Sequence, residues 1–202
     1  MKMITLVMLS GGLDSAYILA KLLRETDDDV IAHHIHLITN AGRHEPEAIS
    51  CQKIVDYCQK EFRPFVYTVS TIDRRGFLFH GRDIISAAFE AGALAGSHKL
   101  ATGKRLDRWT IGISLADNVE PNRFKQADSA CRMNCPPDTS PEFFLFDRVS
   151  QQKIINYLPY KLYKMAWSCR FAKKDSKGEF SPCGECNSCK RLEGFMHPEE
   201  PA

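Results

Sequence analysis

Apolar residues in the first half of the chain alternate between short runs and helical stripes. Residues 3–9, 30–38 and 65–69 are rich in apolar and β-branched residues over the length of a strand. Helical spacing after each run predicts helices with apolar stripes at Ala16, Leu19, Ala20 and Leu23; at Cys51, Ile54, Val55, Cys58 and Phe62, from near Pro46; and at Ile84, Ile85, Ala88, Phe89 and Leu94. This alternation predicts an α/β fold, with a parallel sheet covered by helices on both faces.

The pattern is weaker in the second half of the chain. Residues 99–114 contain one strand or two, and residues 121–130 are compatible with a short helix. Residues 131–141 contain three prolines and are expected to form a loop, whereas Ser150 is a suitable N-cap for a helix that runs through Leu158. From Ser168 onward polar residues, glycine and cysteine dominate, which is typical of a small metal-binding segment rather than of a core.

Length and charge narrow the class of protein. We expect one domain over residues 1–202, because 202 residues suffice for one core. The net charge of +2 gives no general attraction to nucleic acid or membrane, so direct nucleic-acid binding stays open. We expect a cytoplasmic protein, since the sequence shows neither a signal peptide nor an apolar stretch of ~20 residues. In that compartment its eight cysteines should be thiols, and a cluster of them indicates a metal.

The stretch from Leu9 to Ser15, LSGGLDS, joins the first predicted strand to the first predicted helix. A helix N-terminus binds anions through its unpaired N–H groups, and Gly11 and Gly12 let backbone approach a phosphate closely. Asp14 would repel a phosphate unless Mg²⁺ lay between them, or it would serve as a helix cap. The residues alone leave open a plain turn capped by Asp14 and a nucleotide site.

The complete string SGGLDS resembles the PP-loop of the ATP pyrophosphatases, whose fold is Rossmann-like and adenine nucleotide α-hydrolase-like. The resemblance implies that Leu9, Ser10, Gly11, Gly12, Leu13, Asp14 and Ser15 bind ATP with Mg²⁺. It also implies that Ser10, Asp14 and Ser15 take part in catalysis. The reaction expected is adenylation of a substrate oxygen, which replaces a poor leaving group with AMP.

Four cysteines near the C-terminus have the spacing of metal ligands. Cys183, Cys186 and Cys189 form a CxxCxxC pattern, and Cys169 lies fourteen residues before it. Four thiolates close a tetrahedral Zn²⁺ site of a structural kind, so residues 167–195 are expected to be a zinc knuckle. An iron–sulfur cluster is less favoured because no further cysteine follows, and disulfides are disfavoured by the compartment.

Both ends of the chain together resemble the 7-cyano-7-deazaguanine synthases of the queuosine pathway. WSC at residues 167–169 and CGECNSCKRLEGF at residues 183–195 are similar to that family's C-terminal segments, and GRHEPEA, HGRD and IGISLADNVEPNRF are looser matches. The resemblance implies that ATP activates the carboxylate of 7-carboxy-7-deazaguanine, a deazapurine acid, for attack by ammonia to an amide and then a nitrile. It also implies a homodimer.

Departures from that family leave other activities open. Asp83 stands for the asparagine of PGRN, and Asn122 precedes Arg123 where the family has cysteine. A repurposed paralogue would transfer the activated acid to an amine of a protein or nucleic acid, in a phage or anti-phage role. A tRNA thiolase is a second alternative, with Cys131 and Cys135 as its cysteine pair. A degenerate nucleotide-binding module is a third, which the intact SGGLDS disfavours.

Candidate substrate-binding residues follow the predicted strands or match the family's segments. They are Arg43, His44, Glu47, Arg82, Asp83, Asp117 and Arg123. Asp83 is also compatible with a mere helix cap, and residues 43–47 with a solvated loop. His33, His34 and His36 are expected to be packed or hydrogen-bonded rather than metal-bound, Cys131 and Cys135 to be free thiols in a mobile loop, and Cys51 and Cys58 to belong to the core.

Overall fold

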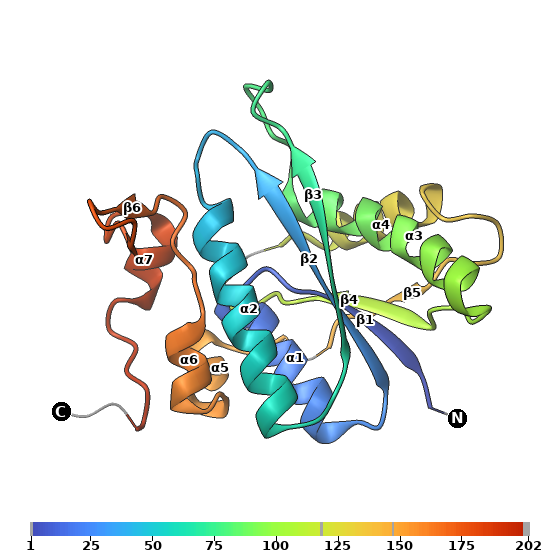
Figure 1. Cartoon of the computed structure of the whole chain (residues 1–202), viewed down its shortest axis with the longest axis horizontal. Coiled ribbons are helices and arrows are strands. Elements are labelled where there is room, and N and C mark those ends of the chain that lie inside the picture. Colours follow the sequence, from blue (N-terminus) through green and yellow to red (C-terminus); the bar gives the residue numbers. More distant parts are fainter. Residues whose placement is uncertain (1, 118, 147, 200–202) are drawn as a thin grey trace.

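A five-stranded parallel sheet forms the centre of the computed structural model, which describes residues 2–117, 119–146 and 148–199 (Figure 1). Its strands are β1 (Ile4–Met8), β2 (Asp29–Ile38), β3 (Val66–Asp73), β4 (Arg108–Ile111) and β5 (Glu142–Phe143), in the order β3-β2-β1-β4-β5. Every pairing is parallel. The strand order reverses at β1, which places a topological switch point beside the loop that follows this strand.

Helices cover both faces of the sheet, as the alternating pattern predicts. On one face α1 (Leu13–Glu25) and α2 (His44–Glu61) pack with α5 (Gln151–Tyr157) and α6 (Tyr160–Met165) around a core that includes Leu19 and Ile54. On the other face α3 (Asp83–Thr102) and α4 (Pro121–Met133) pack around Trp109 and Ala91. The fold class is α/β and Rossmann-like, which confirms the prediction.

The C-terminal segment lies at the end of the molecule beside α2 and α6 (Figure 1). It contains the short antiparallel strands β6 (Lys173–Lys174) and β7 (Phe180–Ser181) and the helix α7 (Asn187–Leu192). The Trp167 backbone N–H donates a 2.8 Å hydrogen bond to Gly11 O, and the His197 ring bonds Leu158 O at 2.7 Å. These bonds hold the segment against the β1–α1 loop and the end of α5.

The structure differs from the sequence expectations mainly between residues 97 and 145. Helix α3 continues to Thr102, where the left-handed Gly103 ends it. Residues 99–114 therefore contain the end of this helix and a single strand, β4, and the turn η1 (Leu115–Asp117) follows. Helix α4 continues to Met133, so Cys131 is a buried helical residue and not part of a mobile loop. The Ser150 cap is confirmed, since its side chain accepts a hydrogen bond from Lys153 N.

Within the described residues, no helix has both the length and the apolar character needed to cross a membrane.

Candidate functional site

A cavity of about 630 Å³ opens at the carboxyl ends of β1, β2 and β4. Segments far apart in the sequence meet there: the β1–α1 loop, the starts of α2, α3 and α4, the turn after β4, and the C-terminal segment. Its charged lining residues are Asp14, Arg43, Glu47, Arg82, Asp83, Asp117, Glu120, Arg123, Arg170 and Arg191. All the cations among these described residues are arginines, the side chain that pairs best with carboxylates and phosphates.

The β1–α1 loop is held in place by its own serines and by two neighbouring segments. Ser10 N donates to Ser15 Oγ at 3.2 Å, and the Ser15 hydroxyl donates to Gly12 O at 3.0 Å. Gly11 adopts a φ of +80°, and its carbonyl accepts from Ser50 Oγ at 2.8 Å as well as from Trp167 N. Leu9, Ser10, Gly12, Leu13 and Asp14 line the cavity, whereas Gly11 and the buried Ser15 do not.

Asp14 is a carboxylate without a protein partner for one of its oxygens. It lies in the first turn of α1, and no side chain caps this helix, so the capping interpretation of Asp14 does not hold. Its Oδ1 is buried and unpaired. Burial and the charge of Asp117 raise the pKa of Asp14 to about 6, against the lowering effect of Arg191. A buried, unpaired carboxylate oxygen at a helix N-terminus is a suitable ligand for a hard cation.

A second group of charges joins α2, α3 and the C-terminal segment. Asp83 Oδ2 accepts hydrogen bonds from Arg43 Nη2 at 2.8 Å and from Arg170 Nη1 at 3.1 Å. Glu47 lies 3.6 Å from Arg43, and burial raises the pKa of Glu47 to about 7, more than Arg43 lowers it. Burial would raise the pKa of Asp83 as well, but Arg43 and Arg170 outweigh it and hold this pKa below its usual value. Asp83 is therefore an ionised counter-ion and makes no capping hydrogen bond in α3.

The other predicted substrate residues divide into two groups. Arg82, Asp117 and Arg123 line the cavity, and Asp117 accepts a 2.9 Å hydrogen bond from Arg191. His44 does not line it, and its ring packs against His36 with 5.0 Å between the ring centres.

The turn after β4 lies close to the start of α1. A Cβ atom on Gly112 would overlap backbone atoms of Asp14 and Ser15, so only glycine fits at this position.

The histidines of β2 are hydrogen-bonded or packed, as expected: His33 and His34 make hydrogen bonds, and the His36 ring packs against His34 and His44. His33 contacts the hydroxyls of Thr68 and Ser70 at 2.8 and 3.0 Å, and burial lowers its pKa to about 4. His34 Nδ1 lies 3.0 Å from Leu9 O, and both histidines are among the residues that line the cavity. The lowered pKa values of His33 and His34 mean that both side chains are uncharged parts of the cavity wall at neutral pH.

The four predicted metal ligands converge on one point. The sulfur atoms of Cys169, Cys183, Cys186 and Cys189 all lie within 4.8 Å of one another, with 3.9 Å between Cys183 and Cys189 and 3.5 Å between Cys186 and Cys189. A tetrahedral zinc with Zn–S bonds of about 2.3 Å separates its sulfurs by about 3.8 Å, so the arrangement fits such an ion. Backbone N–H groups of Glu185 and Cys186 lower the pKa of Cys183, which favours the thiolate. This group can hold a metal.

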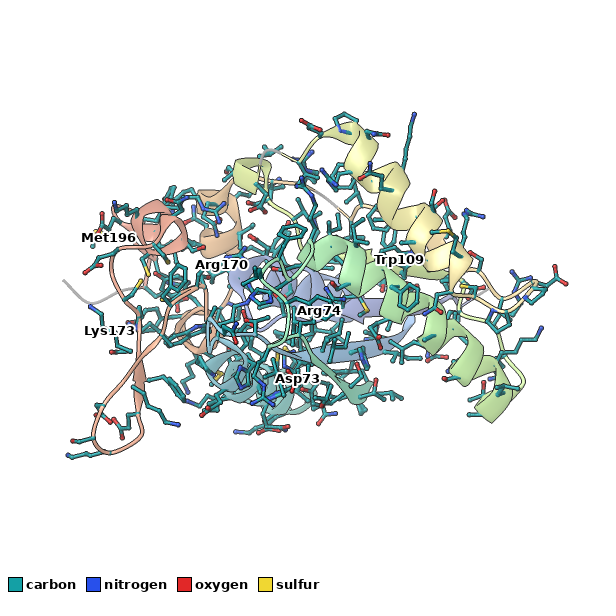
Figure 2. All side chains as sticks on the ribbon, turned by 90° about the horizontal axis from the view of Figure 1, so that it is seen from above. Asp73, Arg74, Trp109, Arg170, Lys173 and Met196 are labelled. Carbon is teal, nitrogen blue, oxygen red and sulfur yellow. The ribbon has the colours of Figure 1, made fainter. Side chains whose placement is uncertain are left out.

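Several cavity residues escaped the sequence reasoning. Arg170 follows Cys169 directly, and Arg191 lies two residues after Cys189, yet both line the cavity together with Trp167, Ser168 and Ser188. Figure 2 shows Arg170 between the C-terminal segment and the sheet. Their position beside predicted metal ligands was the available signal, but nothing in the sequence showed that the segment folds back over the cavity.

Comparisons with known proteins assign neither a family nor an activity to this chain. No protein-family model matches the chain, and no curated protein matches it. Among solved structures, it is similar to the U34-tRNA thiolase NcsA from Methanococcus maripaludis with its [4Fe-4S] cluster, at 14% identity over 94% of this chain and 62% of that chain, with a TM-score of 0.43. A second is a multidomain structure (adenylation, ketoreductase and pseudo Asub) of a keto acid-selecting NRPS module, at 16% identity over 66% of this chain and 10% of that one, with a TM-score of 0.35. The chain thus spans less than two thirds of either relative, and these low scores support no activity or ligand.

Proposed function

We propose that the chain is an ATP-dependent carbon–nitrogen ligase of the PP-loop type. Its substrate would be a deazapurine acid, 7-carboxy-7-deazaguanine, and its nucleophile ammonia. The observation that carries the proposal is the position of the SGGLDS loop, residues 10–15, at the N-terminus of α1 and at the mouth of an arginine-lined cavity. A phosphate site and an acid-binding wall therefore face the same space.

The loop supplies the groups that ATP would need. The first N–H groups of α1 have no partner inside the helix, and Gly12, the residue before this helix, lines the cavity. Ser10 adds a hydroxyl, and the unpaired Oδ1 of Asp14 would hold Mg²⁺ between the loop and the phosphates. The buried Ser15 hydroxyl instead orders the loop through its hydrogen bond to Gly12 O. ATP supplies AMP as a good leaving group for a carboxylate oxygen that otherwise leaves poorly.

The acid would lie between the phosphate site and the arginines. A cavity of about 630 Å³ is within the range of sites for small molecules and cofactors. Arg43, Arg82 and Arg123, with Arg170 and Arg191, offer cations for its carboxylate and for the phosphates. Once the acid is adenylated, ammonia would attack its carbonyl carbon and AMP would leave. A second activation, of the amide oxygen, would then lead to the nitrile.

The cysteine group would hold zinc. We propose this ion because four thiolates fill a tetrahedral site and leave no open position, as in structural zinc centres. The metal would then order the segment of residues 167–195 that places Arg170 and Arg191 at the cavity. A single domain of residues 1–202, a homodimer and a cytoplasmic location remain further proposals.

The alternatives differ in the acceptor. Transfer of the activated acid to an amine of a protein or nucleic acid would use the same loop and cavity. A thiolase that uses Cys131 and Cys135 is less well supported, because no cysteine is among the described residues that line the cavity. Cys131 is buried in α4, and its carbonyl faces Gly92 of α3.

The test is incubation of the protein with ATP, Mg²⁺ and 7-carboxy-7-deazaguanine, with and without ammonia, followed by mass spectrometry. The proposal expects amide and nitrile with ammonia, and acid-dependent exchange of pyrophosphate into ATP without it. Ser10→Ala should lower the exchange, whereas Ser97→Ala, on the exposed side of α3, should not. Label that appears on a protein or nucleic acid would favour the paralogue. No ATP consumption with any deazaguanine acid would refute both.

A further inference from the structure

Asp83 occupies a position that resembles a bound carboxylate. One of its oxygens accepts hydrogen bonds from Arg43 and from Arg170, at 2.8 and 3.1 Å, although these arginines come from opposite ends of the chain. Arg43 is almost covered, with 13% of its side chain exposed, whereas half of the Asp83 side chain is exposed. Arg43 is therefore held in the wall, whereas Arg170, with 52% of its side chain exposed, and the Asp83 carboxylate are both reached by solvent.

We propose that Arg43 and Arg170, the arginine pair, bind the carboxylate of the acid substrate, and that Asp83 is a resident counter-ion which this carboxylate displaces. The inference rests on the proposed function, which supplies an acid as the substrate. It adds Arg170 as a binding residue and gives Asp83 an inhibitory role that a cap or a direct substrate contact would not have.

The charges around the pair support displacement rather than joint binding. The two arginines together with Asp83 carry about one net positive charge. Glu47, 3.6 Å from Arg43, neutralises part of this charge when it is ionised. A second carboxylate beside Asp83 would meet a like charge at short range, which costs free energy. If Asp83 leaves the pair, the incoming carboxylate takes over both hydrogen bonds. Arginine suits this exchange because its planar donors match any carboxylate.

The backbone gives Asp83 freedom to leave. It is the first residue of α3, its side chain caps no N–H, and the residue before it, Arg82, has an extended backbone. Gly81, at a φ of +79°, connects this helix start to the exposed turn after β3. Loss of the ion pair therefore breaks no hydrogen bond within α3.

Asp83→Asn tests the inference by the sign of its effect. It keeps the shape of the side chain and removes the competing charge, so binding of 7-carboxy-7-deazaguanine, and of indole-3-carboxylate as an unreactive flat acid, should tighten by about fivefold, the upper end for an exposed ion pair. The neutral amide of each acid should bind equally to both proteins. Binding is measured by calorimetry without ATP, so that no reaction interferes.

Arg170→Gln should weaken acid binding in the same titration. Lys173→Gln is its control, because Lys173 belongs to the same segment, lies away from the sheet in Figure 2 and pairs with Glu185 at 3.8 Å. Arg170→Lys and circular dichroism check that any loss reflects the arginine rather than unfolding. If Asp83→Asn weakens acid binding or leaves it unchanged, or if Arg170→Gln binds as the wild type does, the inference is wrong.

The two proposals fail in different ways. Tighter acid binding by Asp83→Asn, with no acid-dependent pyrophosphate exchange in any variant, would keep the arginine pair and refute the ligase. Exchange in the wild type together with unchanged acid binding by Asp83→Asn would keep the ligase and refute the resident counter-ion. Absence of acid binding in both wild type and Asp83→Asn would refute the arginine pair.

Discussion

Arg191 donates a 2.9 Å hydrogen bond to Asp117, and this ion pair joins the cysteine segment to the turn that follows β4. Arg191 lies two residues after Cys189, and both partners line the cavity. The segment that can hold a metal is thus attached to the wall of the candidate active site by its own side chains. The order of the cavity wall should therefore depend on the order of the cysteine segment, and the reverse.

Arg191→Gln should loosen this attachment with little effect on global stability. The pair is partly exposed, so its loss should cost less than about 1 kcal/mol of unfolding free energy. Hydrogen exchange should nevertheless accelerate in residues 187–192 and 115–117, because the bond holds these two elements together. Lys190→Gln, an exposed neighbour, is the control. Equal exchange in the two variants would show that the pair does not order the segment.

Cys183→Ser should remove the metal and release the C-terminal segment. The wild type is expected to carry about one zinc per chain, and a structural zinc supplies folding free energy to the segment that binds it. Residues 167–195 should then become sensitive to protease while the sheet survives. Cys135→Ser, outside the cluster, should change neither zinc content nor cleavage. A metal-free wild type that resists protease, or zinc retained by Cys183→Ser, would contradict this prediction.

The predictable parts of this protein are those encoded by short-range patterns. The first three strands and their helices follow from periodicity, and Cys183, Cys186 and Cys189 from spacing, because each depends on residues close in sequence. β5 is only two residues long and pairs with β4 across more than thirty residues of chain, so no local pattern marks it. Helix α3 was predicted shorter because residues 99–102 lack a clear apolar stripe.

The residues of the candidate site can likewise be divided into those that local sequence predicts and those that only the folded chain brings together. The loop from Leu9 to Ser15 is contiguous, so its placement at the cavity could be anticipated. Arg170 and Arg191 could not be, because their approach depends on residues 166–199 folding back along α2 and α5. His44 shows the converse error: it follows a strand end and matches a family segment, yet it packs on His36 outside the cavity.

Gly112→Ala should displace the β1–α1 loop. A methyl group there would overlap the backbone of Asp14 and Ser15, so either β4 or the start of α1 must move. Overpacking of this kind costs about 1–3 kcal/mol, and here it distorts the proposed phosphate site as well. Nucleotide binding, measured by calorimetry, should fall more than stability alone explains. Gly76→Ala, where a methyl group would meet no atom within 4 Å, is the matched control. Unchanged nucleotide affinity in Gly112→Ala would argue against a role of this contact.

Asp14→Asn should stabilise the protein at neutral pH and abolish its proposed activity. The pKa of Asp14 rises from 3.8 to about 6 on folding, so the folded chain binds the proton more tightly than the unfolded chain does. Ionisation therefore opposes folding: the penalty is absent well below pH 4, grows between pH 4 and 6, and is complete above pH 6. Allowing for partial exposure, it amounts to about 2 kcal/mol.

Urea unfolding at pH 4, 6 and 8 measures this effect. Asp14→Asn should exceed the wild type by about 2 kcal/mol at pH 8 and match it near pH 4, while Asp27→Asn, exposed in the turn before β2, should show no such trend. Pyrophosphate exchange should be lost in Asp14→Asn, because an amide binds Mg²⁺ more weakly than a carboxylate does. A buried carboxylate that keeps one oxygen without a partner, at a cost in stability, is what a functional group shows, whereas a structural one would stabilise the fold. Lower stability of Asp14→Asn at pH 8 would assign Asp14 to the structure and remove it from the candidate site.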